Sequence, residues 1–165
     1  MSGRRAQFQN NINSLRIRNA TNSDLDKVKI IDTQTGGVSK PAYWDQTFKQ
    51  YGGRKQNHFF LVSELEGEVV GFIIGEVRAW EFGSPPCGWI LGMGVKTEVQ
   101  LHGIATQMLS VIKEYFKKAE VRKVRTMVSR SNRPILSFFR SQGMMAGPYI
   151  ELEMDLAEEL SNLPR

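Results

Sequence analysis

The clearest hydrophobic pattern in the chain lies just after Gly103. Apolar residues recur there at intervals of four positions, and lysines fall on the other side; the apolar set is Ile104, Met108, Ile112 and Phe116 with Leu109 beside them, and the lysines are Lys113, Lys117 and Lys118. This spacing is typical of an amphipathic helix with one packed face and one face in water. The pattern therefore predicts a helix that begins next to a glycine.

A second pattern, of period two, lies near the end of the chain. From Tyr149 to Leu156 the apolar residues Ile150, Leu152, Met154 and Leu156 alternate with the acidic residues Glu151, Glu153 and Asp155. Successive side chains of a strand point to opposite faces. We therefore predict a strand here, with the apolar residues facing inward.

The remaining elements follow from similar patterns and from turn residues between them. Predicted strands cover residues 15–20, 58–64, 68–80, 89–95 and 121–129, and predicted helices cover 21–32, 42–51 and 133–141. Glu66 and Gly67 form the turn of a hairpin, and Gly52 and Gly143 end helices. The order βααβββαβαβ indicates an α/β (α+β) domain around a mixed sheet.

The junction between the strand at 89–95 and the following helix carries the most specific motif. Gln100, Gly103 and Ala105 form the pattern Q-x-x-G-x-A directly before the helix. The first N–H groups of a helix lack intrahelical partners and attract anions. Since Gly103 has no side chain, phosphate oxygens can approach these amides closely. The motif predicts a pyrophosphate site at residues 101–106.

The strand before this motif contains two glycines on one face, Gly92 and Gly94. Glycines inside a strand often mark a close approach of a ligand or of another backbone. The alternative is a core strand that glycines kink.

Three segments, in order, resemble the GNAT superfamily of N-acetyltransferases. The motif at 100–105 is similar to the acyl-CoA signature Q/R-x-x-G-x-G/A, the segment 15–32 resembles the opening strand and helix, and 132–144 resembles the closing segment. The resemblance covers roughly residues 15–156. It implies a mixed, mostly antiparallel sheet with helices on both faces, acetyl-CoA as cosubstrate, and a cofactor site at Met93, Gly94, Val95, Gln100, Leu101, His102, Gly103, Ile104, Ala105, Thr106, Asn132 and Phe139.

Within the resemblance, two residues of the closing segment are informative. Asn132 matches a residue that hydrogen-bonds the pantetheine arm, but it is equally suited to cap the helix that follows. Phe139 stands where the family has a tyrosine that protonates the leaving thiolate. There are three possibilities: the thiolate leaves without a positioned acid, a water or Ser137 donates the proton, or catalysis is lost.

Acetyl transfer also requires an amine that has lost its proton, and a carboxylate is the base that the family often uses. Glu76 lies in the apolar strand FIIGEVRAW, where a carboxylate is out of place unless it faces a polar cleft. The alternative is a strand residue that faces solvent or lies next to Arg78. Glu81 is the second candidate. Tyr43, Trp44, Trp80 and Phe82 either line an aromatic acceptor site or serve in packing.

Composition limits the alternatives. The 165 residues, 41% hydrophobic and 24% charged, suit one globular domain over residues 15–156, between a polar, flexible arm (1–14) and a short tail (157–165). We see no apolar run long enough to cross a membrane and no secretory signal. The single Cys87 suits a reducing cytoplasm, and two histidines predict no metal site.

The net charge of +5 favours an anionic partner, and CoA phosphates are sufficient to explain it because the basic residues are scattered. A nucleic-acid binding module is therefore the weakest of three hypotheses. The first is an acetyl-CoA-dependent N-acetyltransferase that acts on a small amine or on a peptide or protein amine, without a metal, as a monomer or homodimer. The second is a non-catalytic acyl-CoA binding or regulatory domain.

Overall fold

The computed structural model describes residues 14–156. By its internal contacts the chain forms two compact units, which divide between Met127 and Val128. The expected arm at 1–14, apart from Ser14, and the expected tail at 157–165 lie outside the described residues.

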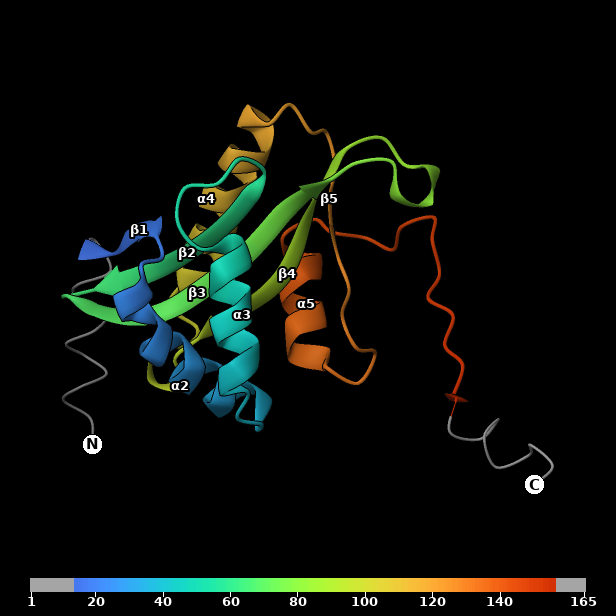
Figure 1. The fold of residues 1–165 in the computed structure, drawn as a ribbon. Helices are drawn as coiled ribbons and strands as arrows, with labels where there is room; N and C mark the ends of the chain where they lie inside the picture. Colours follow the sequence, from blue (N-terminus) through green and yellow to red (C-terminus); the bar gives the residue numbers. More distant parts are fainter. Residues whose placement is uncertain (1–13, 157–165) are drawn as a thin grey trace, which may run out of the picture. The chain divides into compact units, whose positions relative to one another are not determined.

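The first unit is built on one five-stranded sheet (Figure 1). The strands lie side by side in chain order: β1 (Arg16–Asn19), β2 (His58–Leu65), β3 (Glu68–Arg78), β4 (Cys87–Val95) and β5 (Val124–Thr126). The first four strands pair antiparallel and β5 pairs parallel to β4. The predicted mixed, mostly antiparallel sheet is confirmed.

Helices cover both faces of this sheet, as predicted. The helices α2 (Leu25–Gly36) and α3 (Pro41–Tyr51) lie on one face and α4 (Ile104–Lys118) lies on the other (Figure 1). Short 3₁₀ helices precede α2, follow β3 and follow β4, at Asn22–Asp24, Glu81–Gly83 and Thr97–Val99. On the α3 side, the buried Trp44 ring makes an edge contact with Phe72 of β3, with centroids 5.0 Å apart.

On the α4 side, glycines of the sheet allow close packing against a phenylalanine. A Cβ added at Gly88 would lie 2.6 Å from the Phe116 ring, and one added at Gly75 would lie 2.8 Å from the same ring. The predicted apolar stripe of α4 is buried, and Met108, Ile112 and Phe116 are at most 1% exposed. The four-residue spacing thus predicted this face correctly, whereas the sheet glycines that admit Phe116 depend on the tertiary fold.

The start of α2 is tied to the sheet by an ion-pair cluster. Arg18 of β1 donates to Asp24 at 2.7 and 2.8 Å and to Glu64 of β2 at 2.8 and 3.0 Å. The Thr21 backbone N–H and hydroxyl also donate to Asp24. The Arg18 hydrogen bonds, followed by those from Thr21, lower the pKa of Asp24 to about 2, although its burial opposes the shift.

The second unit contains α5 (Arg133–Ser141), which matches the predicted helix, and an extended segment after it. The predicted strand at 149–156 is wrong, since this segment has no strand structure. Its apolar side chains are exposed, with Ile150 at 82% and Leu152 at 87%. Alternation specifies two faces but supplies no pairing partner, and a strand needs both. The strand predicted at 121–129 is likewise reduced to β5 because pairing with β4 stops at Thr126.

Within residues 14–156, no helix has the length and apolar character needed to span a bilayer. In the same range, no three His, Cys, Asp or Glu side chains are grouped as metal ligands would be.

Candidate active site

The loop that connects β4 to α4 is open where the sequence predicts an anion site. Gly103 is the N-cap of α4, in a left-handed conformation with φ 79° and ψ 4°. A Cβ added there would meet no atom within 4 Å. Among residues 14–156, no side chain caps α4, and the first turn of the helix contains no acidic residue. A ligand anion would therefore reach the amides of Ile104 and Ala105 without displacing a protein group.

Side chains of the motif stabilise the loop from within. Gln100 donates its Nε2 to the Val95 carbonyl at 3.0 Å. His102 Nδ1 lies 3.1 Å from the Val99 carbonyl and 2.9 Å from the Gln100 carbonyl, so Nδ1 carries the proton. Leu101 is fully exposed at φ 69°. Gln100 and His102 thus shape the backbone, while the predicted contact with phosphate belongs to the main chain.

The strand β4 has an irregularity that sequence reasoning missed. Ile74 of β3 faces Gly92, but the next residue, Gly75, faces Ile90, which leaves Leu91 as a bulge. β5 pairs with β4 only at 88–90. A bulge re-aims a side chain and ends regular pairing. The later part of β4, with the predicted cofactor residues Met93, Gly94 and Val95, therefore has an edge that β5 does not occupy.

The two strand glycines have different surroundings. A Cβ at Gly94 would lie 2.7 Å from Phe72 and 3.2 Å from Ile31. One at Gly92 would have its nearest neighbour at 3.9 Å, again in the Phe72 ring. Gly94 thus lies against core side chains, and Gly92 leaves an open position.

Glu76 lies in a polar cluster beneath α3. Glu76 is buried, at 7% exposure, and its side chain accepts a hydrogen bond from the Tyr51 hydroxyl at 2.9 Å. Arg78 donates to its other oxygen, and His58 Nε2 lies 3.6 Å from Oε2. The ion pair with Arg78 offsets the cost of burying the carboxylate. Glu76 is therefore not solvent-facing: it is buried among polar groups, and it is paired with Arg78, as the second interpretation allowed.

Two further groups belong to this cluster. Burial, followed by the hydrogen bond to Glu76, raises the pKa of Tyr51 to about 12, so the hydroxyl keeps its proton at neutral pH. Glu81 is about half exposed and lies 3.5 Å from Arg78. The Arg78 guanidinium also lies over the Trp89 ring at 5.4 Å. The two predicted catalytic carboxylates are thus joined through one arginine.

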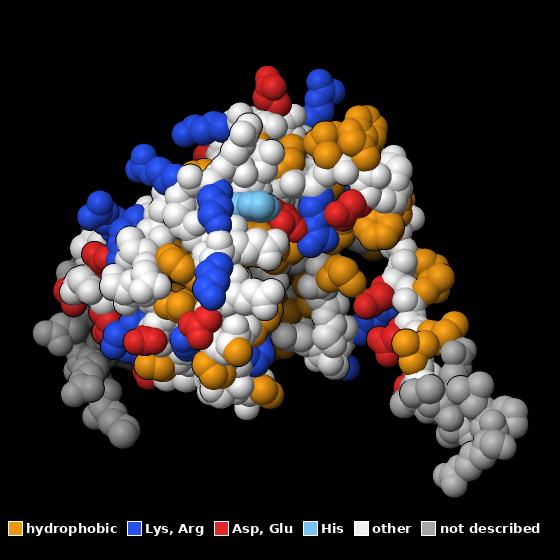
Figure 2. All heavy atoms as spheres, in the orientation of Figure 1, with side chains coloured by type: hydrophobic (Ala, Val, Ile, Leu, Met, Phe, Trp, Pro, Cys, Tyr) orange, Lys and Arg blue, Asp and Glu red, His pale blue; other side chains and the backbone are white. Residues whose placement is uncertain are grey.

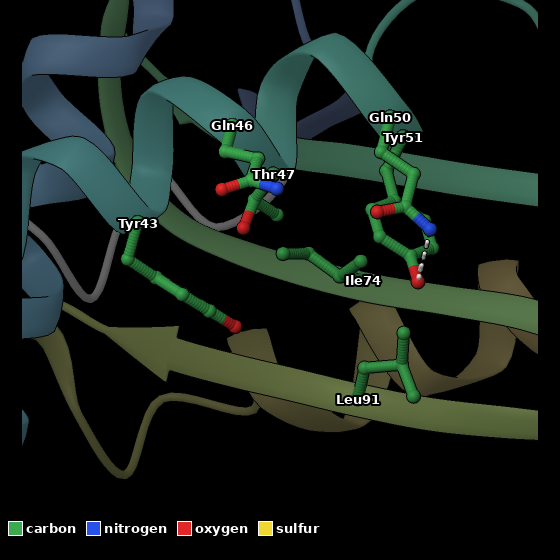
Figure 3. A pocket seen from close by; sticks show the side chains of 7 residues that line it. All are labelled: Tyr43, Gln46, Thr47, Gln50, Tyr51, Ile74 and Leu91. Carbon is green, nitrogen blue, oxygen red and sulfur yellow. Dashed lines mark hydrogen bonds between the residues drawn. The ribbon is translucent and has the colours of Figure 1, made fainter.

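A cavity of about 290 Å³ adjoins this cluster between α3 and the strands β3 and β4 (Figure 3). It is lined by Tyr43, Gln46, Thr47, Gln50, Tyr51, Ile74 and Leu91. Tyr51 therefore lines the cavity and also donates to Glu76. Leu91, the bulged residue, lies on the cavity wall opposite α3 (Figure 3).

The four candidate aromatic residues have separate surroundings. Tyr43 lines the cavity. Trp44 is buried in the core, and its Nε1 donates to Asp32 at 2.8 Å. Trp80 and Phe82 are more than 70% exposed, both at positive φ. Of these four residues, only Tyr43 is among those that line the cavity.

Two further predicted site residues, Asn132 and Phe139, belong to the second unit. The Asn132 side chain accepts a hydrogen bond from the Ile135 amide at 3.3 Å, which is the helix-cap geometry. Phe139 is buried, at 5% exposure, and its ring contacts that of Phe138 edge-on. The cap interpretation of Asn132 is thus realised, and its amide nitrogen is not used in the cap.

Basic residues do not gather into one patch on the face shown in Figure 2. Lys and Arg side chains are spread over it and alternate with Asp and Glu. On this face the charge pattern offers no continuous basic surface of the kind that nucleic-acid binding uses.

A model of the acetyltransferase (GNAT) family matches residues 25–144, which include the open loop, β4 and Glu76. The chain belongs to this family. Two curated relatives from Methanocaldococcus jannaschii are named uncharacterized N-acetyltransferases. MJ1530 is 30% identical over a match that covers 61% of this chain and 58% of MJ1530. MJ1207 is 25% identical over a match that covers 83% of this chain and 63% of MJ1207. The chain thus spans about 60% of the length of the curated relatives it matches.

Solved structures agree on the fold of this GNAT chain. The aminoglycoside N-acetyltransferase AAC(6')-Iy in complex with CoA has a TM-score of 0.74 at 14% identity, over 86% of this chain and 95% of that one. A possible acetyltransferase from Clostridium difficile 630 has a TM-score of 0.71 at 20% identity, and the match covers 86% of this chain and 97% of that one. The sheet and helices described above are therefore those of a GNAT fold, and a structure of this fold holds CoA.

Proposed function

We propose that the chain is an acetyl-CoA-dependent N-acetyltransferase that transfers the acetyl group to a primary amine by direct attack in a ternary complex. The observation that carries this proposal is the open, left-handed turn at Gly103, at an uncapped helix N-terminus inside the family match. The loop 100–106 binds the pyrophosphate of CoA through main-chain amides. The edge of β4 at 93–95, which does not pair with β5, binds the pantetheine arm. The family resemblance adds Asn132 and Phe139 of the second unit as further cofactor residues.

The reaction needs a neutral amine nitrogen near the thioester carbonyl. The amine lone pair attacks the carbonyl carbon, the C–S bond breaks, and CoA leaves as the thiolate. The proton that the acylated nitrogen then loses passes through solvent to the thiolate, which gives the amide and the CoA thiol. A backbone N–H of β4 near Met93 or Gly94 stabilises the oxyanion that forms. Phe139 has no proton to donate, so the thiolate leaves without an acid at this position; a thiol has a reference pKa of only about 8.5.

We propose Glu76 as the acceptor of the amine proton, reached through the Tyr51 hydroxyl. Tyr51 passes its hydrogen-bonded proton to Glu76 as it takes one from the ammonium, and it stays neutral throughout. This route is supported by the 2.9 Å hydrogen bond between Tyr51 and Glu76 and by the position of Tyr51 on the cavity wall. Glu81, half exposed and paired with Arg78, is the second candidate for the base.

Release of CoA thiol, measured with a panel of amines, tests the proposal. Glu76→Gln removes the base, and we expect kcat/KM to fall by about 10²-fold or more. Because this change also leaves Arg78 without its partner, Tyr51→Phe is the companion variant, which keeps the ion pair and breaks the link to the cavity. Glu114→Gln, an exposed acid on α4, is the control. Unchanged turnover in both test variants would exclude Glu76 as the base.

A second function is favoured by one residue. With phenylalanine at position 139 in place of the expected tyrosine, the chain is also suited to bind acyl-CoA without catalysis. Titration calorimetry with CoA and the thiol assay separate the two functions. Binding without thiol release, for any amine offered, identifies a binding domain, and release identifies a transferase.

A further inference from the structure

The cavity beneath α3 has one polar wall and one apolar wall. Five of its seven lining residues come from a single face of α3, at spacings of three and four positions: Tyr43, Gln46, Thr47, Gln50 and Tyr51. Ile74 and Leu91 form the opposite side (Figure 3). Pockets for small ligands usually have volumes of about 300–1,000 Å³. The cavity, at about 290 Å³, is therefore small for a ligand pocket.

The polar wall carries hydrogen-bonding groups but no net charge. Among residues 14–156, no acidic or basic side chain lines the cavity. Tyr51 stays protonated at neutral pH because burial and Glu76 raise its pKa to about 12. The carboxylate behind Tyr51 is already paired with Arg78. A ligand that carries a carboxylate, or a positive charge in addition to that of its reacting amine, would therefore bring a charge into the cavity that has no ionic partner. Burying an unpaired charge is costly.

A short chain of hydrogen bonds fixes one part of this wall. Gln50 Nε2 donates to the Tyr51 hydroxyl at 3.3 Å, and Tyr51 donates to Glu76 at 2.9 Å. Because the amide nitrogen of Gln50 is turned to Tyr51, its oxygen points away from that hydroxyl (Figure 3). Gln50 thus offers an acceptor for an N–H group, while Gln46 offers both a donor and an acceptor.

We infer that the acceptor is a small primary amine whose only charge is the amine itself and whose remaining polar groups are amides or hydroxyls. This inference rests on the proposed function. The amine nitrogen lies near the Tyr51 hydroxyl, and the amide or hydroxyl groups bind Gln46, Thr47 and Gln50. The apolar wall contacts the carbon skeleton of the acceptor.

Three amines of similar size test this selectivity in the thiol-release assay with saturating acetyl-CoA. Glycylglycinamide has an uncharged body, glycylglycine adds a carboxylate, and 1,5-diaminopentane adds a second ammonium. We expect kcat/KM for glycylglycinamide to exceed that for each of the other two at least tenfold. Equal turnover of the three amines, or preference for a doubly charged one, would overturn the inference while the transferase proposal stands. No turnover with any amine would refute both.

A charge introduced on the cavity wall supplies an independent check. Gln46→Glu places a carboxylate in the cavity, and we expect the ratio of kcat/KM for the diamine over the amide to rise at least tenfold. The matched control is Gln34→Glu, which makes the same change at an exposed position of α2 outside the cavity. A ratio that stays constant in Gln46→Glu, with CoA affinity intact, would show that the acceptor does not bind this wall.

Discussion

Gly103 and Gly37 form a matched pair that isolates the role of the loop before α4. Both are left-handed, Gly103 with φ 79° and ψ 4° and Gly37 with φ 73° and ψ −2°. An added Cβ would meet no atom within 4 Å at either position. Alanine at either site therefore introduces the same backbone strain and no clash with the protein. The two positions differ in that only Gly103 belongs to the proposed pyrophosphate site.

General values for backbone strain and for lost ligand contacts give the expected size of both effects. A non-glycine residue in the left-handed region costs about 1–2 kcal/mol, and for a chain of this length each kcal/mol lowers Tm by about 2–4 °C. We expect Gly103→Ala and Gly37→Ala to lose similar thermal stability. In Gly103→Ala the methyl group also occupies the space through which phosphate oxygens approach. We expect its Kd for CoA to rise at least tenfold, equivalent to about 1.4 kcal/mol.

Calorimetric titration with CoA at a temperature well below either Tm measures the affinity, and thermal melts without ligand measure the strain. The expected result is equal loss of Tm in the two variants and loss of CoA affinity in Gly103→Ala alone. A Gly103→Ala protein that binds CoA as tightly as Gly37→Ala and the unmodified chain would refute main-chain binding of the pyrophosphate at this loop.

Other changes separate packing, charge and capping. Gly94→Ala should lower the free energy of unfolding in urea by about 1–3 kcal/mol, because the added methyl group overpacks the core. Gly92→Ala has open space and should leave this free energy nearly unchanged. Equal losses in the two variants would contradict the packing difference. The pKa of Asp24 is lowered to about 2 by its hydrogen bonds to Arg18, so its contribution to stability is present above about pH 4 and is lost as pH falls toward 2. Asp24→Asn should flatten the stability profile between these pH values, and an unaltered profile would exclude the pair as its source. Asn132→Asp keeps the cap oxygen and removes the amide donor. If the amide binds pantetheine, the Kd for CoA should rise in this variant while Tm is unchanged. Asn132→Ala removes the cap as well, so its free energy of unfolding should also fall by about 1 kcal/mol.

Local patterns in the sequence were sufficient for most of the helices and strands. The spacing of Ile104, Met108, Ile112 and Phe116 defined α4 and its buried face, because helix periodicity is set within a few residues. Gly103 marked the start of that helix and the open loop for the same reason. The alternating segment at 149–156 was misread because its strand character depends on a pairing partner that a local pattern does not specify.

Only the tertiary structure decided the composition of the candidate acceptor site. Tyr51 reaches Glu76 across 25 positions of sequence, and the bulge at Leu91 brings a side chain of β4 to the cavity that α3 lines. Neither contact has a local periodic signature, since each depends on how a helix packs on a sheet and on the register of two strands. The sequence by itself therefore determined the family, the open loop before α4 and the helical faces. The pairing of Glu76 and the neutral wall of the cavity arose from packing between segments distant in the chain.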